Sequence, residues 1–206
     1  MADSTVSVYN MALGWLGGDQ LPTSEAAWDD SDPIGRLCKN LFPEVLRQCL
    51  EAHEWSFAAK SETLARKPEA AREGWMYRCA LPSDCLRPLR LEGCGLPLTG
   101  PAFIIEGIDI LCNVDPARML YIGHVQDPKR WPPTFTSALS WGLASILATA
   151  NNNDQRVQQN CLQRHQMALE EAWALDQQTQ NEPPQPSAWA QARYGSFHPH
   201  HHPWRR

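Results

Sequence analysis

The sequence predicts an α+β fold, with about four helices that pack as a bundle, a small antiparallel β insert and an extended C-terminal tail. Apolar residues recur at helical spacing up to residue 60 and again between residues 131 and 180. Between these segments, short β-rich runs are separated by Pro, Gly and Asp. We therefore divide the chain into a first helical half (1–60), a β-rich insert (61–130), a second helical half (131–180) and a docking tail (181–206).

Two helices are predicted in the first half. The first runs from about Thr5 to Leu16, because its apolar residues share one face and Gly17 follows as a stop signal. The second runs from Pro33 to about His53, and Pro43 inside it should kink the helix or divide it in two. The apolar face of the first helix consists of Val8, Met11, Ala12, Trp15 and Leu16.

The insert is predicted to be an antiparallel sheet or meander between Trp75 and Val125. Its candidate strands are the runs WMYRCAL, LRPLRL, AFIIEG, DILCNV and MLYIGHV. In the first run, alternation places Trp75, Tyr77, Cys79 and Leu81 on one face. The charged stretch ETLARKPEAAREG before it is predicted to be an exposed excursion.

Helical spacing resumes after Pro133. The helix from about Phe135 to Leu147 is apolar nearly all round, which predicts that it forms the buried centre of the helical part. After the turn Asn151–Asp154, a long amphipathic helix reaches about Gln180. Its inward residues are predicted to be Val157, Cys161, Ala168, Ala172 and Leu175.

Composition narrows the class of protein. Hydrophobic residues make up 43% of the chain and the formal net charge is -5, which favours a globular protein and argues against one that coats phosphate backbones. We expect synthesis and folding in a cytoplasm, because the N-terminus has no secretory pattern. The longest apolar stretch, Ala138 to Ala150, is well short of the ~20 residues that span a bilayer, so we expect no membrane partner.

Candidate catalytic and metal-binding residues are few. Cys79, Cys85 and Cys94, with His53 and His124, could supply a thiol nucleophile or a metal site, but no nucleophile elbow or metal-ligand spacing accompanies them. We expect buried strand residues, and no enzyme, metal or cofactor. An acidic cluster lacks the glycine and distal glutamate of a calcium loop and is better explained as a helix-capping loop. The cluster consists of Glu25, Asp29, Asp30 and Asp32.

Three aromatic residues are predicted to be structural anchors. Trp55 and Phe57 follow the second helix directly, where large rings can fold back and hold the helix against the sheet. Trp141 extends the apolar stripe of the central helix.

A series of short motifs follows in chain order. They are Tyr9-Asn10-x-Ala12-Leu13-x-x-Leu16-Gly17, Gly35 to Cys38, Pro43 within a helix, Glu51 to Ala58 (EAHEWSFA), Tyr77 to Arg87 (YRCALPSDCLR), Tyr121-Ile122, Asp127-Pro128, Trp131, Phe135 to Leu147, and Ala168 to Gln177. In this order they resemble the tail tubular protein A family of bacteriophages, which are head-to-tail connector adaptors, also called gatekeeper-type adaptors. The likeness covers most of residues 4 to 180, whereas the segment after Pro183 matches loosely.

The resemblance implies a structural virion protein assembled in the bacterial host cytoplasm. Such adaptors form a ring, usually twelvefold, beneath the portal protein, and present a platform to a downstream tail or nozzle protein. The resemblance implies that the helices form the ring wall and that the β insert faces the tail. DNA is expected to pass the lumen without specific binding, and a net acidic chain suits such passage because few phosphate contacts would slow it.

The last segment, YGSFHPHHHPWRR, is open to several interpretations. It could hold a metal through His198, His200, His201 and His202, be a purification tag, or bind nucleic acid. We favour a docking peptide for the portal or a neighbouring subunit, because extended Pro-rich segments lose less entropy on binding and aromatic and Arg residues dominate interfaces. The candidate docking residues are Trp189, Arg193, Tyr194, Phe197, Trp204, Arg205 and Arg206.

Two alternatives stay open. The first is another ring of the phage neck or tail, such as a completion, stopper or nozzle protein. The second is a cysteine-dependent phage enzyme that uses Cys79, Cys85 or Cys94.

Overall fold

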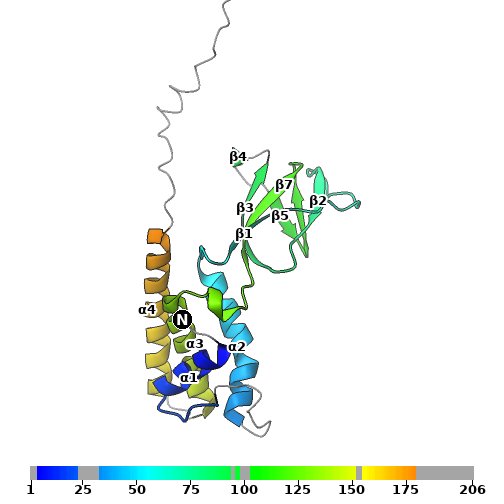
Figure 1. The fold of residues 1–206 in the computed structure, drawn as a ribbon. Helices are drawn as coiled ribbons and strands as arrows, with labels where there is room; N and C mark the ends of the chain where they lie inside the picture. Colours follow the sequence, from blue (N-terminus) through cyan, green and yellow to red (C-terminus); the bar gives the residue numbers. More distant parts are fainter. Residues whose placement is uncertain (1–3, 23–32, 94–95, 98–102, 152–154, 180–206) are drawn as a thin grey trace, which may run out of the picture.

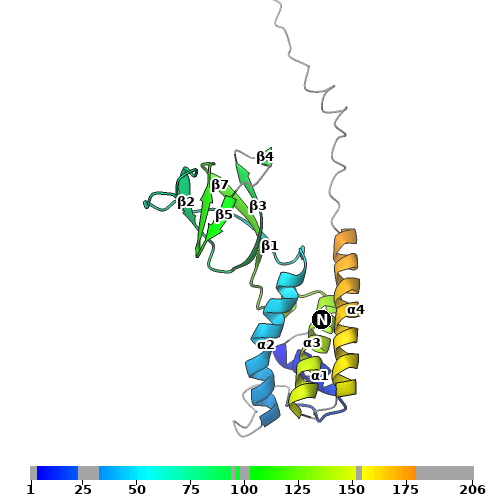
Figure 2. The same ribbon diagram turned by 180° about the vertical axis from the view of Figure 1, so that it is seen from behind.

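The computed structural model describes residues 4–22, 33–93, 96–97, 103–151 and 155–179. It shows a mixed α+β fold, in which helices and strands occupy different ends of the molecule (Figure 1). The view from behind shows the same separation (Figure 2). The described helices are α1 (Thr5–Trp15), α2 (Pro33–Ala52), α3 (Pro133–Asn151) and α4 (Gln155–Thr179).

Helix α1 has a defined start and end. The Ser4 side chain accepts a hydrogen bond from the Ser7 amide and so caps the first turn. At the other end, Gly17 takes a left-handed conformation with φ of 69°. The amides of Gly17 and Gly18 then bond the carbonyls of Gly14 and Leu13 at 3.2 and 3.0 Å. The predicted bounds of this helix are therefore correct to one residue.

Helix α2 runs without interruption from Pro33 to Ala52, so the expectation that Pro43 could divide it is wrong. Pro43 lies on the exposed side of the helix, as does Lys39 one turn earlier. Because the Lys39 carbonyl loses its helical donor on that side, water can replace the missing hydrogen bond. The buried face, which holds the helix in place, consists of Gly35, Cys38, Phe42, Val45, Leu46, Cys49 and Leu50.

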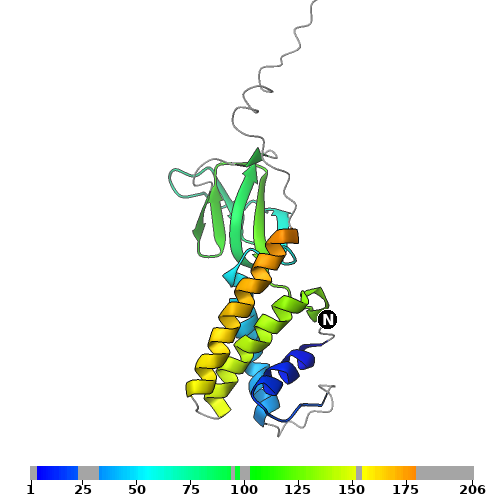
Figure 3. The same cartoon turned by 90° about the vertical axis from the view of Figure 1, so that its left-hand side faces the viewer.

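Helix α3 lies between the other helices, as its apolar composition predicts. It contacts α1, α2 and α4, and Figure 3 shows α4 on one side of it and α1 on the other. Close packing depends on Gly142, where a Cβ atom would lie 2.9 Å from the His165 ring of α4 and 3.1 Å from Val45 of α2. The buried apolar residues of α3 are Phe135, Ala138, Leu139, Leu143, Ala144, Leu147 and Ala148.

Helix α4 departs from prediction at its C-terminal end. Leu175 is 42% exposed, and the buried position is taken by Asp176. The reason is that Asp176 lies four residues after buried Ala172, on the same helical face, and its carboxylate has hydrogen-bond donors to satisfy it. The prediction of Leu175 as an inward residue is therefore wrong.

The insert contains two antiparallel sheets rather than a single one. One sheet has the order β1-β7-β3-β4 and the other β2-β6-β5. Their strands are β1 (Ala59–Thr63), β2 (Tyr77–Ala80), β3 (Cys85–Gly93), β4 (Leu96–Pro97), β5 (Phe103–Glu106), β6 (Asp109–Cys112) and β7 (Ala117–Gly123).

Strand β1 was not predicted, because its sequence AKSET is polar and mostly exposed. It forms because it pairs with the buried strand β7, with Ala59 opposite Ile122. Strand β2 is shorter than its predicted run, since Trp75 and Leu81 lie outside it. Cys79 of this strand is buried as the alternation predicts.

The two ends of the molecule have separate hydrophobic cores. The helical core includes Ala58, just before β1, and extends into the insert through Ile122 and Val125. The core of the insert includes Met119 and Tyr121, which also belong to β7. Strand β7 therefore contributes to both cores and joins them, and it continues through the short 3-10 turn η2 (Pro128–Arg130) to α3.

Among the residues that the structure describes, no helix has both the length and the apolar character that crossing a bilayer would require.

Candidate functional site

The candidate docking residues of the tail all lie outside the described residues, so the structure does not place them. These are Trp189, Arg193, Tyr194, Phe197, Trp204, Arg205 and Arg206. The same is true of the four histidines at 198 and 200–202, of the acidic cluster at 25–32, and of Cys94. The surfaces described below belong to the helices and the insert.

Trp55 and Phe57 lie where α2 meets α3. The Trp55 side chain is 1% exposed, and its Nε1 donates to the Cys49 carbonyl at 2.8 Å. The rings of Trp55 and Phe57 both pack edge-on against Phe135, at centroid distances of 5.1 and 4.9 Å. These contacts join the segment after α2 to the first turns of α3.

Trp141 lies at the surface between α1 and α3. Its ring stacks on Trp15 at 4.4 Å, and the Trp15 Nε1 donates to the Ser140 hydroxyl at 3.1 Å. Trp15 remains 46% exposed, although the sequence placed it on the inward stripe of α1. The pair forms an apolar surface feature that is held in a fixed orientation.

A groove of about 530 Å³ follows the outer side of α1, beside Trp15. We call it the α1 groove. Its described lining residues are all uncharged: Ser4, Val6, Ser7, Asn10, Met11, Gly14, Trp15 and Gln20. Asn10 fixes the wall of the groove, because its amide donates to the Leu21 carbonyl at 2.9 Å and accepts from the Leu21 amide at 2.7 Å.

A second uncharged surface follows α4. At three- and four-residue spacing it includes Leu162, which is 46% exposed, half-buried Leu169, and Trp173, which is 40% exposed. Trp173 also stacks on His53 at 4.9 Å, which fixes its ring near the end of α2. We call this surface the α4 stripe; its residues are Gln155, Gln158, Leu162, Gln166, Leu169, Trp173 and Gln177.

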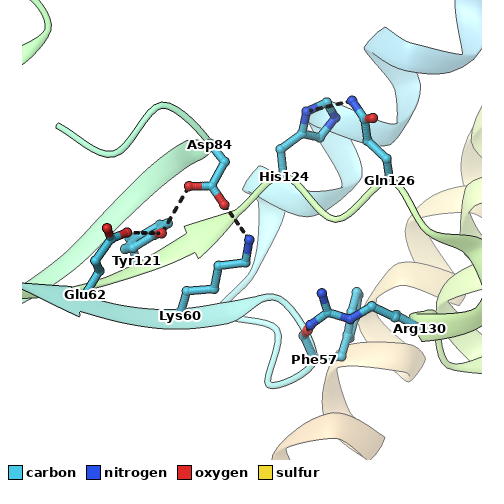
Figure 4. A network of polar contacts seen from close by, with 8 residues as sticks. All are labelled: Phe57, Lys60, Glu62, Asp84, Tyr121, His124, Gln126 and Arg130. Carbon is cyan, nitrogen blue, oxygen red and sulfur yellow. Dashed lines mark hydrogen bonds and ion pairs between the residues drawn. The ribbon is translucent and has the colours of Figure 1, made fainter.

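A polar network joins the ends of β1, β3 and β7 near the helical part (Figure 4). Lys60 forms an ion pair with Asp84, and the Tyr121 hydroxyl donates to the same carboxylate at 3.0 Å. Gly123 allows this arrangement, because a Cβ atom there would lie 2.8 Å from the Lys60 side chain. Burial tends to raise the pKa of Asp84, but hydrogen bonds from Lys60 and Tyr121 outweigh burial and lower it.

Two arginines connect the insert to the helical part directly. Arg87 of β3 donates to the Glu51 carbonyl at 3.2 Å, in the last turn of α2, and Arg130 of η2 donates to the Phe57 carbonyl at 3.4 Å. Together with β7, these contacts set the position of the insert relative to the helices.

The insert also has a groove whose lining includes the basic side chains Lys67 and Arg78, and nearby carboxylates neutralise their charges. Lys67 and Arg78 both bond Asp109, at 2.5 and 2.9 Å, and Arg78 also pairs with Glu106 at 2.6 Å. Hydrogen bonds from Lys67 and then Arg78 lower the pKa of Asp109, so this carboxylate stays charged at neutral pH. These pairs leave little positive charge to attract a phosphate group.

The structure does not support the hypothesis that Cys79 or Cys85 forms a thiol nucleophile or a metal site with His53 or His124. Burial raises the pKa of Cys79 to about 11 and that of Cys85 to about 11, which disfavours the reactive thiolate at neutral pH. His124 lies 3.3 Å from Gln126, and His53 stacks on Trp173. Within the described ranges, no three His, Cys, Asp or Glu side chains gather as a metal site would require.

Sequence reasoning missed Asp176, which accepts hydrogen bonds from the Ser56 amide at 2.8 Å and the Ser56 hydroxyl at 2.5 Å. Helical spacing from Ala172 allowed either Leu175 or Asp176 to face inward, and the donor that decides between them, Ser56, is 120 residues away in the sequence. Sequence reasoning also missed the Lys60–Asp84–Tyr121 network, whose members are far apart in the sequence.

No family model matches this chain, and comparison with the curated proteins finds no relative.

Proposed function

We propose that this protein is a structural virion protein, the head-to-tail adaptor of a bacteriophage. It forms a ring under the portal, connects the capsid to the tail and lets DNA pass. The observation that carries the proposal is the resemblance of residues 4–180 to tail tubular protein A adaptors, motif by motif and in chain order. The strands β1 to β7 lie between α2 and α3, which is compatible with the proposal.

In this proposal the four helices act as a bundle that forms the ring wall. The insert contacts the downstream tail or nozzle protein, and the extended tail of residues 181–206 docks on the portal or a neighbouring subunit. Helix α4 is 25 residues long, or about 38 Å at ~1.5 Å per residue. An extended Pro-rich chain spans ~3.1 Å per residue, so the tail is long enough to reach a portal at either end of the helices.

The charge of the chain is compatible with DNA passage. The net charge is -5, and the basic side chains of the insert groove are paired with carboxylates. A lumen without a surplus of cations would make few phosphate contacts, and each such contact would slow ejection. The proposed mechanism is assembly rather than catalysis, and it needs no cofactor or metal.

The proposal is tested by co-expressing the chain with the portal protein of the same phage. We expect a complex whose native mass corresponds to a ring of this chain on the portal ring, and a negative-stain image with the additional ring under the portal. A stable monomer that fails to bind the portal would contradict the proposal. A ring that binds elsewhere in the neck or tail would favour a completion, stopper or nozzle protein.

The enzyme alternative is tested by replacing Cys79, Cys85 and Cys94 with Ser. Because the proposed role needs no thiol, we expect ring formation and portal binding to persist, with some loss of stability from the buried Cys79. Loss of a chemical turnover in this variant, with assembly intact, would instead support the enzyme.

A further inference from the structure

We infer that neighbouring copies of this chain bind each other through two different surfaces: the α4 stripe of one copy packs on the α1 groove of the next. This inference rests on the proposed ring and names the surfaces that would close it. A ring that closes heterologously needs two unlike complementary faces on each subunit.

The two surfaces lie on different helices that both contact α3. Helix α3 contacts both α1 and α4, and Figure 3 shows these two helices on either side of it. Because the α1 groove follows the outer side of α1, one copy can present its groove to one neighbour and its stripe to the other.

The two surfaces match in charge. The α1 helix, TVSVYNMALGW, contains no ionisable acid or base apart from Tyr9, which is buried. The seven residues of the α4 stripe are Gln, Leu or Trp, and Arg156, Arg164 and Glu171 fall on other sides of the same helix. Glu170 borders the stripe, about 20° round the helix from Gln177. Burying charges at an interface is costly, and the cores of interfaces are depleted in them. Glu54 and Arg87, which lie beside Trp173, pair with each other at 3.6 Å. The apolar centre of each surface can therefore lose its water without leaving an unpaired charge.

The two surfaces also match in length and in anchoring residues. Helix α1 has 11 residues, which is about 16 Å, and the distance along α4 from Leu162 to Trp173 is about the same. Met11 and Trp15 on one surface, and Leu162 and Trp173 on the other, supply the apolar side chains. The Trp15 ring is held by Trp141, and the Trp173 ring by His53, so little side-chain entropy remains to be lost.

Helix α2 offers a contrast. Its exposed residues include Arg36, Lys39, Glu44 and Arg47, a charged surface of the kind that stays in water. Among the described helices, α1 and α4 therefore have the less charged exposed surfaces, which is why we assign the contact between copies to them.

Two charge insertions test the inference with little risk to the fold. Gly14→Glu places a carboxylate in the α1 groove, where a Cβ atom would meet nothing within 4 Å. Leu162→Glu places one in the centre of the α4 stripe, at an exposed position. The matched control is Met167→Glu, because Met167 is 56% exposed on α4 but lies about 140° round the helix from Leu162.

We expect the wild-type chain and Met167→Glu to form the same oligomer in mass photometry and analytical ultracentrifugation. Gly14→Glu and Leu162→Glu should each run as a single chain of 23.2 kDa, with unchanged circular dichroism. An equal mixture of these two variants should form a dimer, because one keeps its stripe and the other keeps its groove. The variants taken separately cannot form that contact.

The outcomes separate the inference from the proposed ring. An oligomer that persists in both variants, or variants that fail to combine in the mixture, would overturn the assignment of the surfaces and leave the ring standing. A wild-type chain that stays monomeric at high concentration and on the portal would overturn both.

Discussion

Asp176 shows how a single polar side chain connects distant parts of this molecule. It lies on the buried face of α4 and accepts two hydrogen bonds from Ser56, which follows the last turn of α2. Trp55, the residue before Ser56, packs against Phe135 of α3. The segment after α2 is therefore held from both sides, by a ring contact with α3 and by a carboxylate from α4.

Replacing Asp176 with Ala should lower the free energy of unfolding by ~1–3 kcal/mol, because the Ser56 donors would lose their buried acceptor. Urea denaturation followed by circular dichroism measures this change. The control is Glu171→Ala, five residues earlier on the exposed side of α4, which should change stability by less than ~0.5 kcal/mol. Equal effects of the two substitutions would show that the Ser56 contact does not stabilise the fold.

At the scale of elements, β1, β3 and β7 are joined at one end by the Lys60–Asp84–Tyr121 network. Strand β1 has little apolar surface of its own, so its pairing with β7 and the Lys60 ion pair hold it in the sheet. The same end of the sheet contacts the last turn of α2 through Arg87. A change in the charge of Asp84 should therefore affect how firmly the insert is attached.

The network predicts a dependence of stability on pH. The pKa of Asp84 is lowered in the folded protein from an ordinary value of 3.8, so its contribution is present above that value and is lost as the pH falls through the lowered pKa. We expect Asp84→Asn to be less stable than wild type by ~1 kcal/mol at neutral pH, since the pair is partly exposed. The difference should shrink as the pH falls below 3.8 and through the lowered pKa of Asp84.

Urea unfolding at several pH values measures that difference, with the exposed Glu69→Gln variant as the control. The control should differ little from wild type at every pH. If the deficit of Asp84→Asn is the same at acidic and neutral pH, the ionised form of Asp84 is not what stabilises the network.

At the scale of the whole molecule, the helices and the insert have separate cores that β7 joins. In the proposed ring, this arrangement would let the helical part contact a neighbouring subunit while the insert contacts a different partner. The exposed apolar residues of α1 and α4 lie in the helical part, and those of the insert, such as Met76 and Ile108, lie apart from them.

Removing residues 187–206 should leave the melting temperature of the folded part nearly unchanged, because the buried residues described for both cores all lie outside the removed segment. Portal binding should weaken, since the candidate anchors Trp189, Tyr194, Phe197 and Trp204 are lost. Differential scanning calorimetry and a pull-down with the purified portal measure the two effects. A full-length variant with a scrambled tail is the control for composition, and unchanged portal affinity of the truncated chain would contradict the docking role.

The sequence by itself determined the local structure. Apolar spacing identified the helices, Gly17 marked the end of α1, and alternation identified the buried side of β2, because these features depend on residues close together in the chain. The tertiary structure alone decided that β1 is a strand, that α2 continues through Pro43, and that Asp176 rather than Leu175 points inward. It also decided that Trp15 stays exposed on Trp141 beside the α1 groove. Each of these depends on a partner far away in the sequence, or on whether a position faces water, and no local pattern contains that information.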